Sequence, residues 1–461
     1  MKSTPDEIYD MVQYFDEEDE EEDEEDDEVD PSNNRTLSGL MQPRVKELDT
    51  AEKFLGGGKK IEVPGVVEHY YENLLALALK TYLRTEKWKV VRVLGLHKDS
   101  RPDYNEINIG PGKRMNVLTM GRLLLRRGDS RLSVRIKFTR HGERAWIAVE
   151  GPAALKKEIK QFAAAIDRTV KKLQLYKGQK IKYSGSLEFL QPGAKKWDDL
   201  SLVPELKEEL RANTVGFLKR SRELARYGIP RKRGLILAGK PGTGKTLISR
   251  VLMSNSPGIT CLAADPALLV HPRYIRDLYA IAGDLKPSIV FLEDIDLIGD
   301  CRSGSSARGD ALNELLDILD GVKECNEVVT IATTNYVEDL DDALSQRPSR
   351  FDRIITMRPP DRELRREIVR NLCRRIPLDQ AVQDHVVCMT EGYTPAQVQE
   401  VIYGLVIQHK SLYHIRKGYR FTTEEVDNVL RRISRRNNEP IGFKKADIYA
   451  DRRDNKTVYP R

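Results

Sequence analysis

The spacing of hydrophobic and polar residues differs between parts of the chain. Residues 66–88 and 152–176 have apolar side chains at helical spacing, which predicts two helices. Shorter apolar-rich runs at residues 89–96, 116–125, 131–139, 145–149 and 180–190 predict strands. Together these elements predict a small α+β domain over residues 61–190.

The second half alternates short apolar runs with helical stretches. Runs at residues 234–238, 258–262, 287–292 and 328–333 have the composition of buried strands, and residues 203–225 and 247–253 have that of helices. This order predicts an α/β core over residues 191–360, with a parallel sheet flanked by helices. Helical stretches at residues 362–374, 379–389, 395–409 and 422–435 then predict an all-α region over residues 361–436.

Both ends of the chain are polar. Residues 1–30 contain 17 acidic side chains against Lys2 alone, a charge of −16, so the remainder carries +22 in a chain of net charge +6. Residues 16–28 form an unbroken acidic block, and we expect residues 1–60 to be disordered because they hold too little apolar surface to offset chain entropy. Residues 437–461 predict a basic, flexible tail.

Composition narrows the possible classes of protein. No apolar run approaches the ~18 residues of a membrane span, and residues 1–10 lack the core of a signal peptide, which predicts a cytoplasmic protein without a span. The five cysteines are scattered and never spaced C-x-x-C, so we expect reduced thiols. No H-E-x-x-H is present, so no zinc protease of that type is expected.

One stretch carries recognisable chemistry. The spacing G-x-x-x-x-G-K-[ST] is met by Gly239, Lys240, Pro241, Gly242, Thr243, Gly244, Lys245 and Thr246. Glycines let successive N–H groups turn toward an anion, the lysine reaches β- and γ-phosphates, and the Thr246 hydroxyl can ligate Mg²⁺. An apolar run precedes the loop and a helical stretch follows it, so the sequence predicts a site for a nucleoside triphosphate and Mg²⁺.

Two further strand ends carry candidate polar groups. Glu293 and Asp294 follow the run at 287–292, and Asn335 follows the run at 328–333. Carboxylates at the carboxyl end of a buried strand lie where open α/β sheets bind ligands. For Asn335 alone, a turn residue and a catalytic residue are equally good interpretations.

The ordered motifs of residues 197–435 resemble the AAA ATPase family. The resemblance rests on Trp-Asp-Asp at 197–199, Tyr-Gly-Ile-Pro at 227–230, the phosphate loop, and the segment A-L-S-Q-R-P-S-R-F-D at 343–352. It implies that the all-α region is a lid and that the chain assembles into a ring, by analogy a hexamer. Pro-Ala-Gln at 395–397 and the order Glu-Asp at 293–294 resemble the branch that contains the mitochondrial Rieske-protein translocase.

The resemblance also implies roles for individual residues. Gly228 and Ile229 would contact the adenine. Glu293 would support the metal, Asp294 would polarise the attacking water, and Asn335 would orient that water. Arg347 and Arg350 would reach the nucleotide of a neighbouring copy. The carboxylates stand in the reverse of the family's usual order, and Asp is one methylene shorter than Glu, so slow hydrolysis is expected.

Three functions remain open. An ATP-driven ring that remodels, unfolds or moves protein clients is the first, with residues 61–190 binding a client or adaptor or serving only a structural role. Residues 265–274 hold no aromatic-x-Gly pore loop, which argues against threading an extended chain. The second is a nucleic-acid-stimulated ATPase, and the sequence argues against it because aromatic residues do not interleave with the basic ones. The third is an assembly scaffold with slow turnover.

Overall fold

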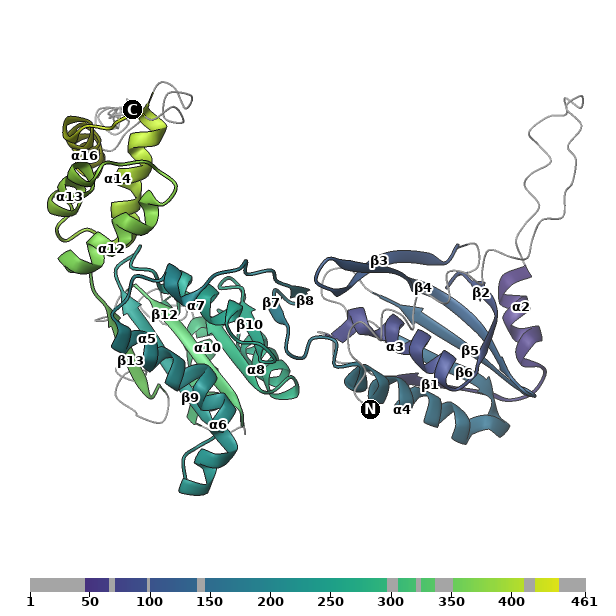
Figure 1. Cartoon of the computed structure of the whole chain (residues 1–461). Helices are drawn as coiled ribbons and strands as arrows, with labels where there is room; N and C mark the ends of the chain where they lie inside the picture. The colour runs from purple at the N-terminus through teal and green to yellow at the C-terminus, as the bar shows by residue number, and fades with distance from the viewer. Residues whose placement is uncertain are drawn as a thin grey trace, which may run out of the picture.

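The computed structural model describes residues 46–65, 71–97, 100–138, 146–296, 306–320, 325–335, 351–409 and 419–438. These residues form two β-sheets with their own helices, followed by a helical bundle (Figure 1). Arg347, Arg350 and both predicted tails lie outside the described residues, apart from residues 46–60 and 437–438 at their inner ends. The prediction of disorder is wrong for residues 46–55, which form a helix.

The first sheet is antiparallel and has the order β1-β6-β5-β4-β2, with β3 paired to β4. Its strands are β1 (Lys60–Gly65), β2 (Lys89–Leu94), β3 (Asp103–Gly110), β4 (Lys113–Arg127), β5 (Ser130–Lys137) and β6 (Trp146–Pro152). Alternate residues of β4 and β5, such as Val117, Leu123 and Val134, point into one buried face.

Helices cover that buried face (Figure 1). They are α3 (Glu72–Thr85) and α4 (Lys156–Leu173). In α4 the buried residues Ile159, Phe162, Ile166 and Val170 recur at three- and four-residue spacing, which makes one apolar stripe. The opposite face of the sheet is covered only in part, by α2 (Lys46–Leu55), where Ala51 packs with Leu94 and Leu124.

The second sheet has the order β13-β9-β12-β11-β10-β7-β8. Five adjoining strands are parallel: β9 (Lys232–Gly239), β10 (Thr260–Ala264), β11 (Ser288–Leu292), β12 (Val328–Thr334) and β13 (Arg353–Met357). Strand β11 is buried along its whole length, which fits its continuous apolar sequence. The predicted α/β core with a parallel sheet is confirmed.

Two strands correct the predicted domain boundary. Strand β7 (Lys180–Tyr183) pairs in parallel with β10, and β8 (Leu187–Phe189) pairs with β7. The prediction placed this stretch in the first domain, whereas its hydrogen bonds belong to the second sheet. A local apolar pattern does not name the partner of a strand. The first sheet therefore ends at β6, and the connection continues through α4.

Helices lie on both sides of the second sheet, and a bundle follows it (Figure 1). The sheet helices are α5 (Pro204–Arg211), α6 (Phe217–Leu224), α7 (Lys245–Ser254), α8 (Pro272–Asp284) and α10 (Ser306–Asp320). The bundle contains α12 (Arg362–Cys373), α13 (Gln380–Met389), α14 (Pro395–Gln408) and α16 (Thr423–Asn438), which share one hydrophobic cluster. The predicted all-α region is confirmed. Across the described residues, no helix is both long and apolar enough to cross a membrane.

Candidate functional site

The phosphate loop lies where β9 ends and α7 begins. Gly242 and Gly244 have φ angles of 81° and 100°, a left-handed conformation that residues with a Cβ rarely adopt. Helix α7 begins at Lys245, so its N-terminal end and the loop amides face the same place. This is the strand, loop and helix that the motif requires.

Lys245 connects the loop to the neighbouring strand. Its Nζ donates hydrogen bonds to the carbonyl oxygen of Gly239 at 2.6 Å, to that of Lys240 at 3.2 Å and to Oδ1 of Asn335 at 2.9 Å. Burial lowers the pKa of the Lys245 ammonium, and the negative charge of Asp294 acts in the opposite direction. The side chain is 7 % exposed, so its charge is held close to where phosphates would bind.

Asn335 continues the connection to the carboxylates. Its Nδ2 donates to Oδ1 of Asp294 at 3.3 Å. Strand β12 lies between β9 and β11, so the carboxyl ends that carry Lys245, Asn335 and Asp294 are adjacent. Asp294 has a φ of 52°, and its backbone N–H is held by the Thr333 hydroxyl at 3.0 Å. The structure thus brings three predicted residues together in one chain of hydrogen bonds.

Glu293 and Thr246 form the other half of the site. The Thr246 hydroxyl donates a hydrogen bond to the Glu293 carboxyl. Burial raises the pKa of that carboxyl, the charge of Asp294 adds to the increase, and Arg250 and Thr246 oppose it. A hydroxyl and a carboxylate are the hard oxygen ligands that Mg²⁺ accepts alongside phosphate and water.

These two oxygens fit a magnesium ion that is held mainly by its nucleotide. Among the described residues, no cluster of three or more His, Cys, Asp or Glu side chains could hold a metal by itself. Sites for Mg²⁺ in ATPases commonly use one or two protein oxygens and complete the shell with phosphates and water. Thr246 and Glu293 would supply those protein ligands.

The helical bundle contacts the phosphate loop directly. The backbone N–H of Ala396, in the first turn of α14, donates to the carbonyl oxygen of Gly242 at 3.1 Å. A Cβ at Gly242 would lie 2.8 Å from Cβ of Ala396 and 2.9 Å from Oγ1 of Thr394. Gln397, in the same turn, accepts from the N–H of Thr394 and so caps α14. The bundle therefore lies over the loop as a lid.

Gly228 and Ile229 do not lie at the phosphate loop. They precede β9, whereas the loop follows it, and a strand of eight residues spans roughly 26 Å. Gly228 ends the preceding helical segment with a φ of 76°, and Ile229 is 37 % exposed. Their assignment to the adenine rested on resemblance alone. The topology places them at the end of the sheet where β9 begins, and the phosphate loop lies where β9 ends.

The segment that contains Leu200 and Ser201 contacts both α7, the helix after the phosphate loop, and the lid. Ser201 accepts a hydrogen bond from Nδ2 of Asn371 in α12 at 3.3 Å, and Leu200 is buried in the cluster that contains Ile248 and Val251 of α7. The sequence analysis used this Trp-Asp-Asp-Leu stretch only as a family marker. In the sequence, the apolar residues directly after the acidic ones were the signal that could have predicted this packing.

Residues 265–274, in which the sequence analysis found no aromatic-x-Gly pore loop, pack against the β7–β8 hairpin. The N–H of Asp265 donates to the carbonyl oxygen of Tyr183 at 3.1 Å, and Lys182 forms an ion pair with Asp265 at 3.0 Å. The rings of Tyr183 and Tyr274 lie 6.2 Å apart. This short segment is therefore held by the connection that leads from the first sheet.

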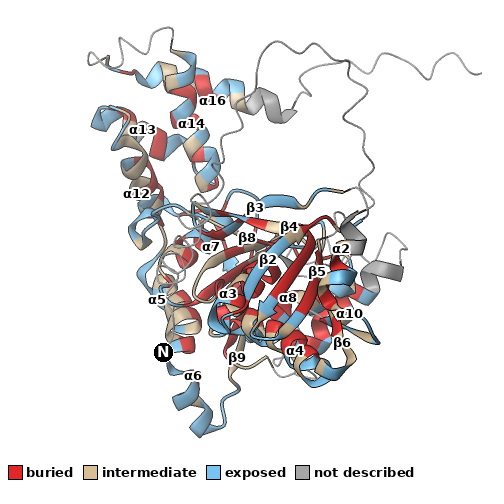
Figure 2. Ribbon diagram, turned by 90° about the vertical axis from the view of Figure 1, so that its right-hand side faces the viewer, coloured by how far each residue is buried: buried red, intermediate tan, exposed pale blue. Residues whose placement is uncertain are grey.

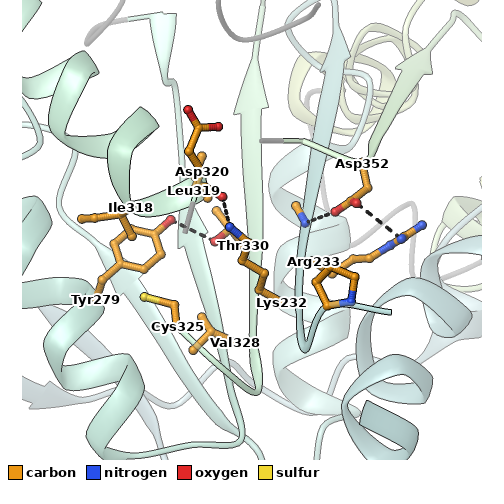
Figure 3. A pocket seen from close by; sticks show the side chains of 12 residues that line it. Lys232, Arg233, Tyr279, Ile318, Leu319, Asp320, Cys325, Val328, Thr330 and Asp352 are labelled. Atoms are coloured by element: carbon orange, nitrogen blue, oxygen red, sulfur yellow. Dashed lines mark hydrogen bonds and ion pairs between the residues drawn. The ribbon is translucent and has the colours of Figure 1, made fainter. Parts of the chain in front are cut away.

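A cavity of about 400 Å³ lies at the end of the second sheet where β9 and β12 begin, opposite the end that carries the phosphate loop (Figure 3). The first residues of β9 and β12 line it, together with Tyr279, Asp320, Cys325 and Asp352. Nζ of Lys232 donates to the carbonyl oxygen of Leu319 inside it, and Asp352 accepts from the N–H of Gly234 at 2.8 Å. Because the phosphate loop follows the last residue of β9, this cavity is separate from the nucleotide site.

Comparisons with known proteins agree with this geometry. Residues 235–359 match the family described as "ATPase family associated with various cellular activities (AAA)". The chain carries an AAA ATPase domain. Most of β9, the strands β10 to β13 and the phosphate loop lie within the matched residues, and the helical bundle follows them.

Several curated proteins are similar over the AAA domain. ATP-dependent zinc metalloprotease FtsH 2 of Sphaerobacter thermophilus is 36% identical over 229 residues, which are 47% of this chain and 35% of that protein. The chloroplastic FTSH 9 of Arabidopsis thaliana is 35% identical over 218 residues, 44% of this chain and 27% of that protein. Protein SAV of Sulfolobus acidocaldarius is 31% identical over 215 residues, 45% and 27% of the two chains. This chain thus matches about a third or less of these relatives' lengths.

Proposed function

We propose that the chain hydrolyses ATP at the phosphate loop and uses the energy to remodel or move protein clients. The observation that carries the proposal is the hydrogen-bonded series Lys245, Asn335 and Asp294 beside the Thr246–Glu293 pair. Bound Mg²⁺ would neutralise charge on the β- and γ-phosphates. In this proposal Thr246 and Glu293 hold the ion, and Lys245 binds the phosphates.

The remaining residues orient the attacking water. Asp294 accepts a hydrogen bond from Asn335 and keeps further lone pairs for a water molecule. Asn335 fixes the position of that carboxylate relative to Lys245. The segment around Ser201, between α7 and the lid, is the better candidate for contact with the base.

The chain works as a ring in this proposal, with Arg347 and Arg350 reaching the nucleotide of the next copy; six copies are the number that family analogy suggests. Asp352 follows these arginines and is tied to Gly234 in both directions, because its N–H also donates to the Gly234 carbonyl at 2.9 Å. That contact holds Asp352, two residues after Arg350, against the sheet. An arginine supplied by a neighbour can raise the rate by about 10³–10⁵.

The contacts of residues 265–274 favour handling a folded client over threading an extended one. This segment is held against the β7–β8 hairpin, which connects to the first sheet. A shift at the nucleotide site can therefore reach the N-terminal unit through β10 and β7. We propose that this unit binds the client or its adaptor.

Mixing two inactive variants tests the ring. Lys245→Ala should lose nucleotide binding, and Arg347→Ala should bind ATP without turnover. In mixed rings, an intact arginine from one variant meets an intact phosphate loop from the other, so activity should return in part. Mixed rings that form, as shown by co-purification of two tags, and stay wholly inactive would contradict action between copies.

A scaffold with slow turnover is the second candidate. The short Asp294 side chain stands where the longer Glu is usual, and its hydrogen bond to Asn335 further limits its reach. Tight ATP binding with phosphate release no faster than that of Asp294→Asn would favour this function over a motor.

A further inference from the structure

Four cations lie together on the face of the first sheet that faces away from α3 and α4. Lys89 of β2 is directly opposite Arg126 of β4, and Arg126 is directly opposite Arg131 of β5. Arg92 is opposite Leu124 in the next row of the same face. We call Lys89, Arg92, Arg126 and Arg131 the basic row. All four are exposed, and like charges placed opposite each other destabilise a sheet.

Elsewhere on this face the arginines have acidic partners. Arg122 pairs with Glu150 at 3.6 Å, and Arg135 pairs with Glu62. Within the described part of the chain, no carboxylate forms an ion pair with the basic row; Arg126 and Arg131 donate only to the carbonyl oxygens of Gly128 and Phe54. An anion that neutralises the basic row therefore has to come from outside the described residues.

The N-terminal helix begins on the same face. Ala51 of α2 packs with Leu124, and the Arg131 guanidinium lies 5.7 Å from the ring centroid of Phe54 (α2 and the exposed strand β2 are visible in Figure 2). The chain that precedes Lys46 therefore continues into a helix that packs on this face through Ala51 and Phe54. That chain contains the acidic block of residues 16–28, within a segment of charge −16.

The distances allow the block to reach the row. Residues 29–45 connect the block to α2, and a polar linker of this length has an end-to-end distance of about 23 Å. Helix α2 is about 15 Å long, and neighbouring strands lie about 4.8 Å apart. A tether of this kind gives an effective concentration on the order of millimolar, so even weak binding would keep the row occupied.

We propose that the acidic block of residues 16–28 binds the basic row of the same chain and covers the open face of the first sheet. The contact is electrostatic and exposed, so salt weakens it over a Debye length of about 8 Å at physiological ionic strength. The block excludes other polyanions from this face, and a client or adaptor that binds there must displace it.

A labelled peptide of residues 1–30 is the probe, and fluorescence anisotropy is the measurement. The receptor is the full chain with the acidic block neutralised to Asn and Gln, so that the tail no longer competes. We expect salt-dependent binding of the peptide. The triple variant Lys89→Glu, Arg92→Glu, Arg126→Glu should weaken binding at least tenfold, and the chain with its native tail should also bind at least tenfold more weakly.

The matched control reverses the same number of charges on the other side of the sheet. Lys156, Lys157 and Lys160 are exposed residues of α4, and their change to Glu should leave peptide binding within twofold. Unchanged circular dichroism and ATP binding establish that both triple variants are folded. Equal loss in the two triple variants would overturn the proposal, as would equal peptide binding to native and neutralised chains. Tight binding of an RNA or DNA oligonucleotide to the basic row of the native-tail chain would also overturn it.

Discussion

The side-chain oxygen of Asn335 accepts a hydrogen bond from Nζ of Lys245 at 2.9 Å. The two residues are far apart in the sequence and meet because β12 and β9 are parallel neighbours. Both polar atoms of the amide form hydrogen bonds, because Nδ2 donates to Oδ1 of Asp294. The asparagine is thus placed between the group proposed to bind phosphate and the group proposed to orient water.

Replacing Lys245 tests the phosphate contact. Lys245→Ala should weaken ATP binding at least 100-fold, because a buried cation beside the phosphates is lost, and calorimetry measures this directly. Lys240→Ala is the matched control, since Lys240 is an exposed lysine of the same loop and should change affinity less than threefold. Equal losses in both variants would show that loop charge alone, without the position of Lys245, determines binding.

Asp294→Asn separates binding from turnover. Asn tolerates the left-handed backbone at this position, so the melting temperature should stay within ~2 °C of the unchanged chain. The amide cannot polarise water as a carboxylate does, and turnover should fall about 10²-fold or more. ATP affinity and phosphate release are measured on the same preparation. A variant that keeps full turnover would remove Asp294 from the mechanism.

The raised pKa of Glu293 sets the acid side of the pH profile. A metal-binding carboxyl must be ionised, so Mg²⁺-dependent turnover should be present above this pKa and should fall at a pH higher than the ordinary Glu value of 4.5. Mg²⁺ titrations of turnover between pH 5 and pH 8 check this. An acid limb that is identical in Glu293→Gln would show that another group titrates.

The raised pKa of Glu293 also predicts how the folding stability of the nucleotide-free chain depends on pH. Folding raises its pKa, so the ionised form costs stability above that pKa, and the cost disappears as the pH falls through it. Glu293→Gln mimics the protonated form. Its melting temperature at pH 7.5 should equal or exceed that of the unchanged chain, and a clear decrease would contradict the direction of the shift.

Gly242→Ala tests the contact between lid and loop. The new Cβ would collide with Ala396 and Thr394, whereas at Gly244, which also has a positive φ, a Cβ would meet no atom within 4 Å. Both changes carry backbone strain of about 1–3 kcal/mol. Only Gly242→Ala should increase amide hydrogen exchange in the first turn of α14. Equal exchange in the two variants would show that strain, and not the collision, explains any effect.

Much of the nucleotide site followed from the sequence. The phosphate loop has a fixed spacing, and Glu293, Asp294 and Asn335 each end a continuous apolar run, so their meeting at one sheet edge could be predicted. Strand pairing could not. The β7–β8 hairpin looks like any local strand pair, and its partner β10 lies far along the sequence. The adenine contact assigned to Gly228 rested on likeness of a motif. That likeness did not take into account that Gly228 precedes β9 whereas the phosphate loop follows it.

The remaining elements carry weak local signals. Strands β1, β3 and β13 went unpredicted because each lies at a sheet edge and its few buried apolar residues are interrupted by exposed ones. The basic row also depends on register, since Lys89, Arg126 and Arg131 become neighbours only when β2, β4 and β5 pair. The roles of Arg347 and Arg350 stay predictions, because these residues lie outside the described part of the chain.

Phosphate release from ATP by the purified full chain, with and without Asn335→Ala, tests the proposed hydrolysis most directly. The account predicts Lys245-dependent turnover in the unchanged chain. In the variant it predicts ATP affinity within threefold and turnover lower by about 10²-fold. Turnover that is the same in both chains, or no turnover above that of Lys245→Ala, would contradict it.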